Sequence, residues 1–189
     1  MVVGSSGPSS TDSIYPNVLN FLHGMKFKVV EGYKAATETH IAMERGEVDG
    51  RCGISWDTLR RAQRGLAARQ ENPHPGADRP RQSAGACRRP SVFDLARTEE
   101  ERQIWALWAA PNKMGRPFFA PPGMAADRAA LMRTAFDATM KDPELRAEAT
   151  KMNLAVDAIT GAEVAALLSR VYATPKAVVA KAALASKGR

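Results

Sequence analysis

The sequence has no run of about 18 apolar residues, which excludes a membrane-spanning helix. Residues 1–7 contain no basic stretch followed by an apolar one, so no signal peptide is encoded, and as written the chain is expected to stay in the cytoplasm. There are only two cysteines and three histidines, and their spacing does not match a metal site. We therefore expect a protein without metal or cofactor.

What is present is a globular composition, with 44% hydrophobic and 25% charged residues in 189 positions. This is enough for one ordinary domain or two small ones. The net charge of +7 normally suggests nucleic acid or an anionic membrane as partner. Residues 60–89, however, contain eight arginines against two acids, a net of +6, so the rest of the chain is nearly neutral.

The arginine-rich segment 60–89 cannot bury a core, because Leu66 is its only large aliphatic residue. One interpretation is a basic nucleic-acid-binding protein that uses this segment, although no aromatic side chain is interleaved for stacking. A second is a disordered linker. The third, which we prefer, is a pair of compensating frameshifts near residues 60 and 90, because a shifted frame can encode an apolar strand over 71–80.

The first part of the chain alternates strand and helix patterns, which predicts an α/β fold. Expected strands lie at 1–3 and 26–31, and another begins at 47–50. Expected helices cover 12–22 and 35–45, each with a glycine after its end.

The second part, from Ser91, is predicted to be mostly helical. Met132, Phe136 and Met140 recur four apart and predict one apolar face of a helix over 125–140. Residues 115–123 are too rich in proline for a helix and predict an edge strand or an extended segment. Helix starts are predicted at the capping boxes 98–101 and 160–163, at Asp142-Pro143 and at Thr174-Pro175, and a short strand at 154–156.

A glycine- and serine-rich loop precedes the first predicted helix and could bind an anion. The backbone N–H groups at a helix start are donors for a carboxylate, and small residues allow the ligand to approach closely. The alternative is an ordinary turn in which Ser10 or Asp12 caps the helix. Pro8 removes one donor and Asp12 adds negative charge, and both count against binding. The candidate ligand-binding residues are Ser5, Ser6, Gly7, Ser9 and Ser10.

The turn after the second predicted strand is a second candidate. Lys34 could offset ligand charge and Thr37 could donate a hydroxyl, with Tyr33 beside them; the alternative is solvated turn residues. Glu38 is expected to cap rather than bind. Asp49 follows the third predicted strand, where cleft residues collect in open α/β sheets, but a turn-capping role is the favoured alternative.

Catalysis has little support in the sequence, which shows no paired carboxylates and no nucleophile elbow. A small hydrolase or isomerase using a serine or aspartate stays a rival interpretation, supported only by isolated residues. We expect a binding protein and not an enzyme.

Four segments together resemble the receptor component of tripartite tricarboxylate transporters. They are Glu31–Lys34, Ala42–Gly50, Gly115–Gly123 and Phe136–Glu144, in the order and with the spacing of that family. The resemblance covers about residues 1–59 and 90–187.

The resemblance implies a periplasmic solute-binding protein of the type II periplasmic-binding-protein fold, whose two α/β lobes close over a carboxylate. Residues 1–100 resemble the second lobe, and 101–189 a mostly helical segment completing the first lobe. The implied partners of this monomer are a small carboxylate and the membrane subunits of the transporter. The family's signal peptide and the first half of its first lobe have no counterpart here, so we expect weak or no carboxylate binding by this chain alone. The resemblance also places the serine loop and the 33–38 turn at the cleft.

Overall fold

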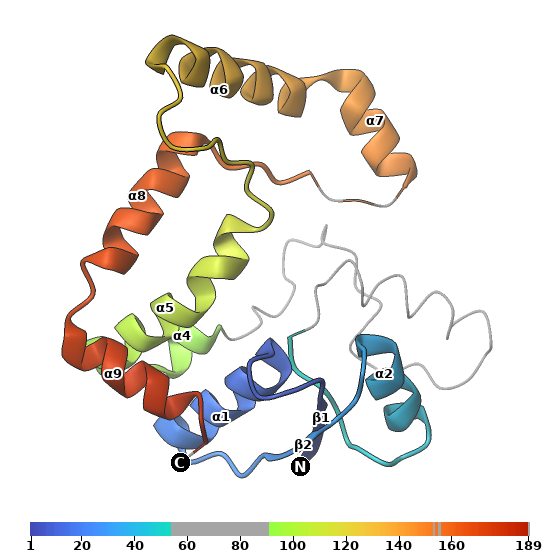
Figure 1. The fold of residues 1–189 in the computed structure, drawn as a ribbon. Coiled ribbons are helices and arrows are strands. Elements are labelled where there is room, and N and C mark those ends of the chain that lie inside the picture. Colours follow the sequence, from blue (N-terminus) through green and yellow to red (C-terminus); the bar gives the residue numbers. More distant parts are fainter. Residues whose placement is uncertain (54–90, 153, 155, 189) are drawn as a thin grey trace. The chain divides into compact units, whose positions relative to one another are not determined.

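The computed structural model describes residues 1–53, 91–152, 154 and 156–188 (Figure 1). The fold is α/β, mostly helical, with a small parallel sheet of two strands in the described part of the chain. The chain forms two units: the first is Met1–Trp105 with Pro175–Arg189, and the second is Ala106–Thr174.

The sheet of the first unit pairs β1 (Val2–Ser5) with β2 (Lys28–Glu31) in parallel, and Val3 lies opposite Val29. On its other edge β1 bonds to the segment around Gly50. There the Gly4 N–H donates to the Gly50 carbonyl at 2.9 Å, and Val3 and Gly50 form a parallel bridge. β1 is therefore central, and the strand predicted from residue 47 is limited to this single bridge.

Two helices follow the strands, close to their predicted ranges. Helix α1 (Thr11–His23) ends at Gly24, whose φ of 64° suits glycine, and α2 (Ala36–Glu44) follows β2. Val18 of α1 is fully buried, so this helix covers part of the core next to the sheet.

The chain returns to the first unit at its end. Short helix α4 (Val92–Leu95) and the start of α5 (Glu99–Met114) belong to this unit, and α9 (Lys176–Ala185) packs against α1. The Asn17 amide of α1 donates to the Ser186 carbonyl at 3.0 Å, and Ala182 and Ala185 of α9 are buried.

The second unit contains the end of α5 together with α6 (Ala126–Lys141), α7 (Pro143–Lys151) and α8 (Gly161–Tyr172). Both predicted caps are confirmed here. The Asp142 carboxylate accepts from the Leu145 N–H at 2.9 Å, and Thr160 and Glu163 form a complete capping box.

The capping box predicted for α5, in the first unit, is half formed. The Thr98 hydroxyl accepts from the Glu101 N–H at 3.2 Å, as predicted. The Glu101 carboxylate instead accepts from the Arg97 N–H, one residue before the expected partner. The helix start is therefore right, and the reciprocal contact is displaced by one position.

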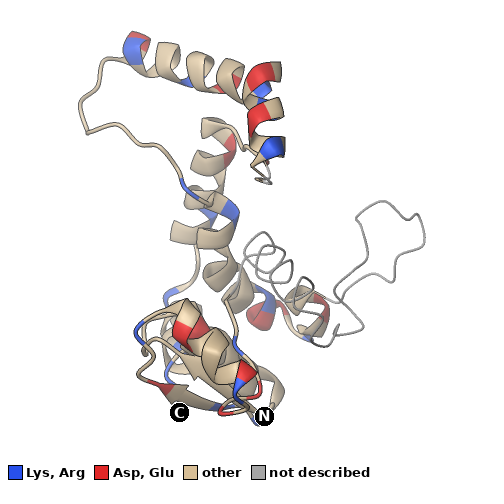
Figure 2. Ribbon diagram, turned by 90° about the vertical axis from the view of Figure 1, so that its right-hand side faces the viewer, with Lys and Arg blue, Asp and Glu red and all other residues tan. Residues whose placement is uncertain are grey.

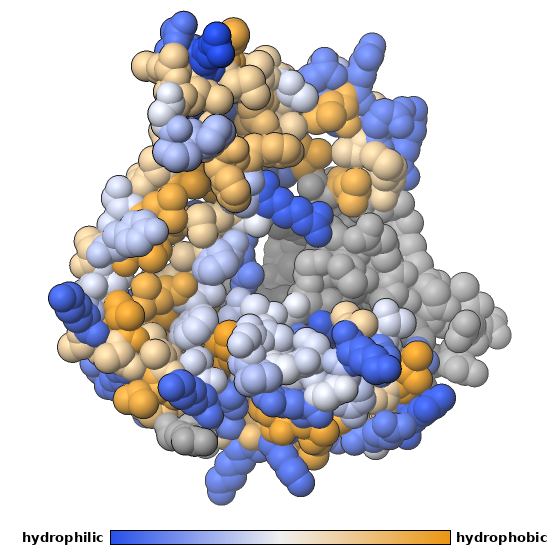
Figure 3. Space-filling model, in the orientation of Figure 1, coloured by the Kyte–Doolittle hydropathy of each residue, from blue (hydrophilic) through white to orange (hydrophobic). Residues whose placement is uncertain are grey.

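Several expectations for the second unit are wrong. Leu154 and Val156, the described residues of the strand predicted at 154–156, form no strand. Residues 115–123 form neither strand nor helix, which excludes the edge strand and leaves the alternative of a non-strand segment. A strand needs a partner edge, and none of the described residues supplies one. Met132 is 62% exposed, and α6 has no buried residue, although its apolar spacing was that of a core helix. Figure 3 shows apolar residues at the surface along this unit.

The two units differ from the predicted division at residues 100 and 101. Residues 175–189 belong with the first unit, because α9 packs on α1. The division into two family lobes stays a prediction. Across the described ranges we find no helix with the length and apolar character needed to span a bilayer.

Candidate functional site

The candidate site lies where the parallel strands end, since the carboxyl ends of parallel strands share one edge of the sheet. Ser5 ends β1 and leads through residues 6–10 into α1, and Glu31 ends β2 and leads to the turn before α2. The Tyr33 N–H donates to the Ser5 carbonyl at 3.3 Å, so the loop and the turn are neighbours. The structure thus brings the serine loop and Tyr33 together.

The hydroxyls of Ser5 and Ser10 form hydrogen bonds within the loop. Ser5 is fully buried, its Oγ lies 2.9 Å from the Ser10 Oγ, and it accepts from the Gly7 N–H at 3.2 Å. The Ser10 hydroxyl donates to the Gly7 carbonyl at 2.8 Å and does not cap α1. Ser5 and Ser10 therefore hold the loop conformation and are not free for a ligand.

The network continues to Ser13 and Glu31, which the sequence analysis missed. The Ser13 Oγ lies 2.7 Å from the Ser5 Oγ and 2.9 Å from the Glu31 Oε1. This chain of hydroxyls fastens the loop to the end of β2. Only the three-dimensional pairing of β1 and β2 brings Glu31 to Ser13, eighteen positions earlier.

The exposed part of the loop has free donors. Ser6 and Ser9 are exposed, and Gly7 is half-buried. In the first turn of α1, the Ser13 and Ile14 N–H groups donate to the Ser10 carbonyl at 3.1 and 2.9 Å. The N–H groups of the two residues before them, Thr11 and Asp12, have no acceptor among the described residues. Together with the helix dipole, these groups can bind a carboxylate.

A buried ion pair lies under the same helix start. The Asp12 Oδ1 is 3.1 Å from the Arg51 Nη2, and both side chains are 7% exposed. The Arg51 Nη1 also donates to the Ala36 carbonyl, at 3.2 Å, where α2 begins. Arg51 thus offsets the negative charge of Asp12 that counted against anion binding. Its position directly after Gly50, at the end of the third predicted strand, was the signal that could have identified it.

Cys52 follows Arg51 but is not activated. Burial raises the pKa of the Cys52 thiol, and Asp12 raises it further, while Arg51 acts in the opposite direction. The thiol is therefore protonated near neutral pH and is a poor nucleophile.

Of the second candidate turn, residues 33–38, Tyr33 contacts the serine loop. The Tyr33 ring covers Gly4, since a Cβ there would lie 3.1 Å from the Tyr33 Cε2. Lys34 and Thr37 are exposed. Glu38 caps the turn as expected, because its Oε2 accepts from the Lys34 N–H at 2.7 Å.

Asp49 is not part of this cluster. Its Oδ2 accepts from the Val2 N–H at 2.6 Å, at the start of β1. The serine loop follows the other end of this strand. The bond with Val2 joins Asp49 to a neighbouring strand 47 positions earlier and not to its own turn, so the structure supports neither the cleft role nor the turn-capping alternative.

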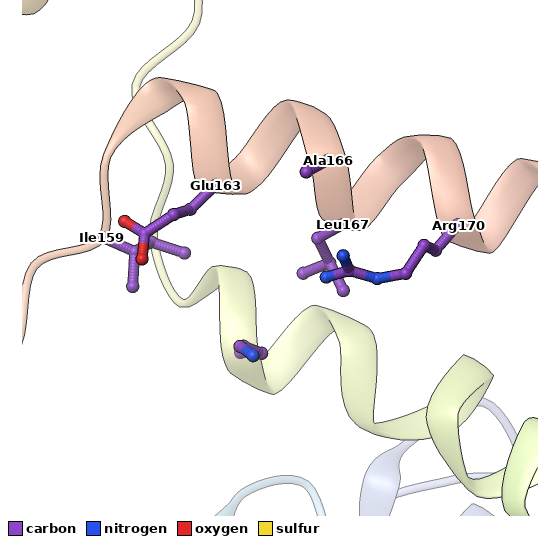
Figure 4. A pocket seen from close by; sticks show the side chains of 6 residues that line it. Ile159, Glu163, Ala166, Leu167 and Arg170 are labelled. Atoms are coloured by element: carbon purple, nitrogen blue, oxygen red, sulfur yellow. The ribbon is translucent and has the colours of Figure 1, made fainter.

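The second unit contains a separate hollow of about 190 Å³ (Figure 4). Its acid, Glu163, is engaged in capping α8: the Thr160 N–H and hydroxyl bonds lower the Glu163 pKa, and the charge of Lys113 adds to this. Lys113 and Arg170 lie in the last turns of their helices, where cations offset the carbonyl dipole. These roles account for its charged groups, so the loop is the stronger candidate. The hollow is lined by Lys113, Ile159, Glu163, Ala166, Leu167 and Arg170.

Other site types find no support in the part of the chain that the structure describes. It has no group of three histidine, cysteine or acidic residues able to hold a metal. Figure 2 shows acidic and basic residues interspersed along the described ribbon. The arginine-rich segment 60–89, on which the nucleic-acid and frameshift interpretations rest, lies outside the described residues.

Comparison with known proteins adds no relative: no family model, curated protein or solved structure matches this chain. The resemblance to the tricarboxylate receptors therefore stays a prediction from the sequence.

Proposed function

We propose that this chain is a solute-binding receptor of the tripartite tricarboxylate type, with a fold of the type II periplasmic-binding-protein class. One observation carries the proposal: the first-turn N–H groups of Thr11 and Asp12 are free of acceptors among the described residues, at the carboxyl edge of a parallel sheet. The α/β class and the four motif segments support it.

In this proposal the ligand is a small carboxylate. One carboxylate group accepts hydrogen bonds from the first turn of α1, and the exposed hydroxyls of Ser6 and Ser9 add donors. The buried Ser5 hydroxyl and the half-buried Ser10 hydroxyl keep the loop in place, so less entropy is lost on binding. Lys34 contributes charge from the neighbouring turn. No bond is made or broken, so the chain is a binder and not an enzyme.

The proposal includes the part that the receptor takes in transport. The receptor acts in the periplasm as a monomer, and the membrane subunits of the transporter take the carboxylate from it. Because the described donors all come from one unit, we expect millimolar affinity and not micromolar.

Titration of the chain with tricarballylate and with its uncharged triamide tests the proposal. Saturable binding of the carboxylate, and none of the triamide, is expected because the donors favour the ionised group. Sodium chloride at matched ionic strength controls for screening. Equal binding of acid and amide, or no saturable binding of either, would contradict the proposal.

A further inference from the structure

Arg51 connects the starts of two helices in the first unit. One guanidinium nitrogen lies 3.1 Å from the Asp12 carboxylate in the first turn of α1. Another donates to the carbonyl of Ala36, the first residue of α2. The side chain is only 7% exposed, so its position is fixed between these two partners. Both helix starts have positive dipole ends, and Arg51 adds a full charge there.

One donor of this guanidinium is unused. The Arg51 Nε is buried and has no hydrogen-bond acceptor in the described residues. Buried polar groups in native proteins nearly always have a partner, and leaving a charged one without it is costly. An oxygen of a bound anion is the partner that a guanidinium fits best.

The ion pair also decides whether the first turn of α1 can accept an anion. The Asp12 carboxylate would repel an incoming carboxylate from the free N–H groups beside it. Arg51 offsets that charge, because its Nη2 lies 3.1 Å from the Asp12 Oδ1. Without Arg51 the site would present donors next to an uncompensated negative charge.

We infer that Arg51 is a ligand-binding residue of this site, whose Nε–H holds one carboxylate of the ligand while its pairing with Asp12 removes the repulsion. This inference rests on the proposed carboxylate-binding function. It assigns the ligand's charged group to the space between the starts of α1 and α2, and it adds a side-chain cation to a site otherwise built from backbone donors and hydroxyls.

Two substitutions that break the same ion pair separate this role from a structural one. Arg51→Gln removes the ligand's cation and leaves Asp12 uncompensated, so the Kd for tricarballylate should rise about tenfold. Asp12→Asn keeps an oxygen for Arg51 but no longer neutralises its charge, so the full positive charge attracts the ligand and the Kd should fall about threefold. Both should lower the Tm, because both weaken a buried pair. A purely structural pair would move both Kd values in the same direction.

Two further variants complete the test. Arg51→Lys keeps the charge but loses the planar fork, so it should fold and still bind more weakly than the parent chain. Arg45→Gln removes one charge from an exposed position at the other end of α2 and should leave the Kd unchanged. If the parent chain binds the carboxylate and Arg51→Lys and Asp12→Asn do not move the Kd in opposite directions, the inference is wrong and the proposed function stands. If the parent chain binds no carboxylate, the proposed function itself fails.

Discussion

Gly4 in β1 has no room for a side chain. An added Cβ would lie 2.6 Å from the Thr39 Cγ2 and 3.1 Å from the Tyr33 ring. Thr39 is fully buried, so it has little freedom to move aside. The glycine therefore lets α2 and the Tyr33 turn pack closely over the strand that leads into the site.

Gly4→Ala should destabilise the chain by about 1–3 kcal/mol through overpacking. Chemical denaturation measures the loss as a lower midpoint. Thr39→Ser removes the nearest methyl group, so in the double variant part of the loss should be recovered. A Gly4→Ala chain as stable as the parent would show that the close packing over β1 is not as described.

For single residues, the composition of the loop was enough to predict the candidates Ser5, Ser6, Gly7, Ser9 and Ser10. It did not predict which of their hydroxyls are exposed. Burial of Ser5 depends on the helix and sheet packed around it. The partners Ser13 and Glu31 could not be predicted from local patterns, and the only local signal for Arg51 was its position after the third predicted strand. They meet the loop only because the strand ends share one edge, across separations of 18 positions for Ser13 with Glu31 and 39 for Arg51 with Asp12.

Helix α8 starts with a complete capping box. The Glu163 carboxylate accepts from both the N–H and the hydroxyl of Thr160, at 2.7 and 2.8 Å. These bonds favour the ionised form and lower the Glu163 pKa in the folded chain.

The lowered pKa fixes the direction of a pH dependence. A depressed folded-state pKa stabilises the folded form at pH values above the unfolded pKa, and this stabilisation is lost as the pH falls through the folded pKa. Carbon NMR titration of the Glu163 carboxyl should therefore give a lower midpoint in the folded chain than in urea. Glu163→Gln should remove the acid-dependent part of α8 stability. Equal midpoints in the two states would contradict the capping-box account.

Helix starts and ends were predictable because their causes are local. Asp142, Thr160 and Gly24 act within one turn of their own helix. Of the two alternatives predicted for 115–123, the edge strand is excluded, because strand pairing depends on a distant partner edge. The apolar face of α6 was read correctly as a pattern, but the sequence does not show whether another element covers it.

At the scale of the whole chain, the last helix, α9, belongs to the first unit, where it packs against α1. Val178, Ala182 and Ala185 of α9 are buried, and its end bonds to Asn17 of α1. Sequence reasoning placed this helix with the preceding helical segment, because nothing local shows that it returns to the beginning of the chain. The stability of α1, and with it the site, should depend on α9.

Two neighbouring substitutions in α9 test this dependence. Ala182→Asp places an unpaired charge at a buried position and should cost more than about 3 kcal/mol. Ala183→Asp is at an exposed position of the same helix and should cost within about 1 kcal/mol. Amide hydrogen exchange of α1 and β1 reports the effect directly. Equal protection of α1 in both variants would show that α9 does not support the first unit.

The central claim is that a carboxylate binds at the start of α1. The most direct measurement is an amide NMR titration of the full chain with tricarballylate, with its triamide as reference. We predict saturable shifts concentrated at the amides of Ser6, Gly7, Thr11 and Asp12 and at the Arg51 Nε–H, and none with the triamide. Carboxylate-dependent shifts elsewhere in the chain with none at these groups, or shifts that the triamide reproduces, would contradict the claim.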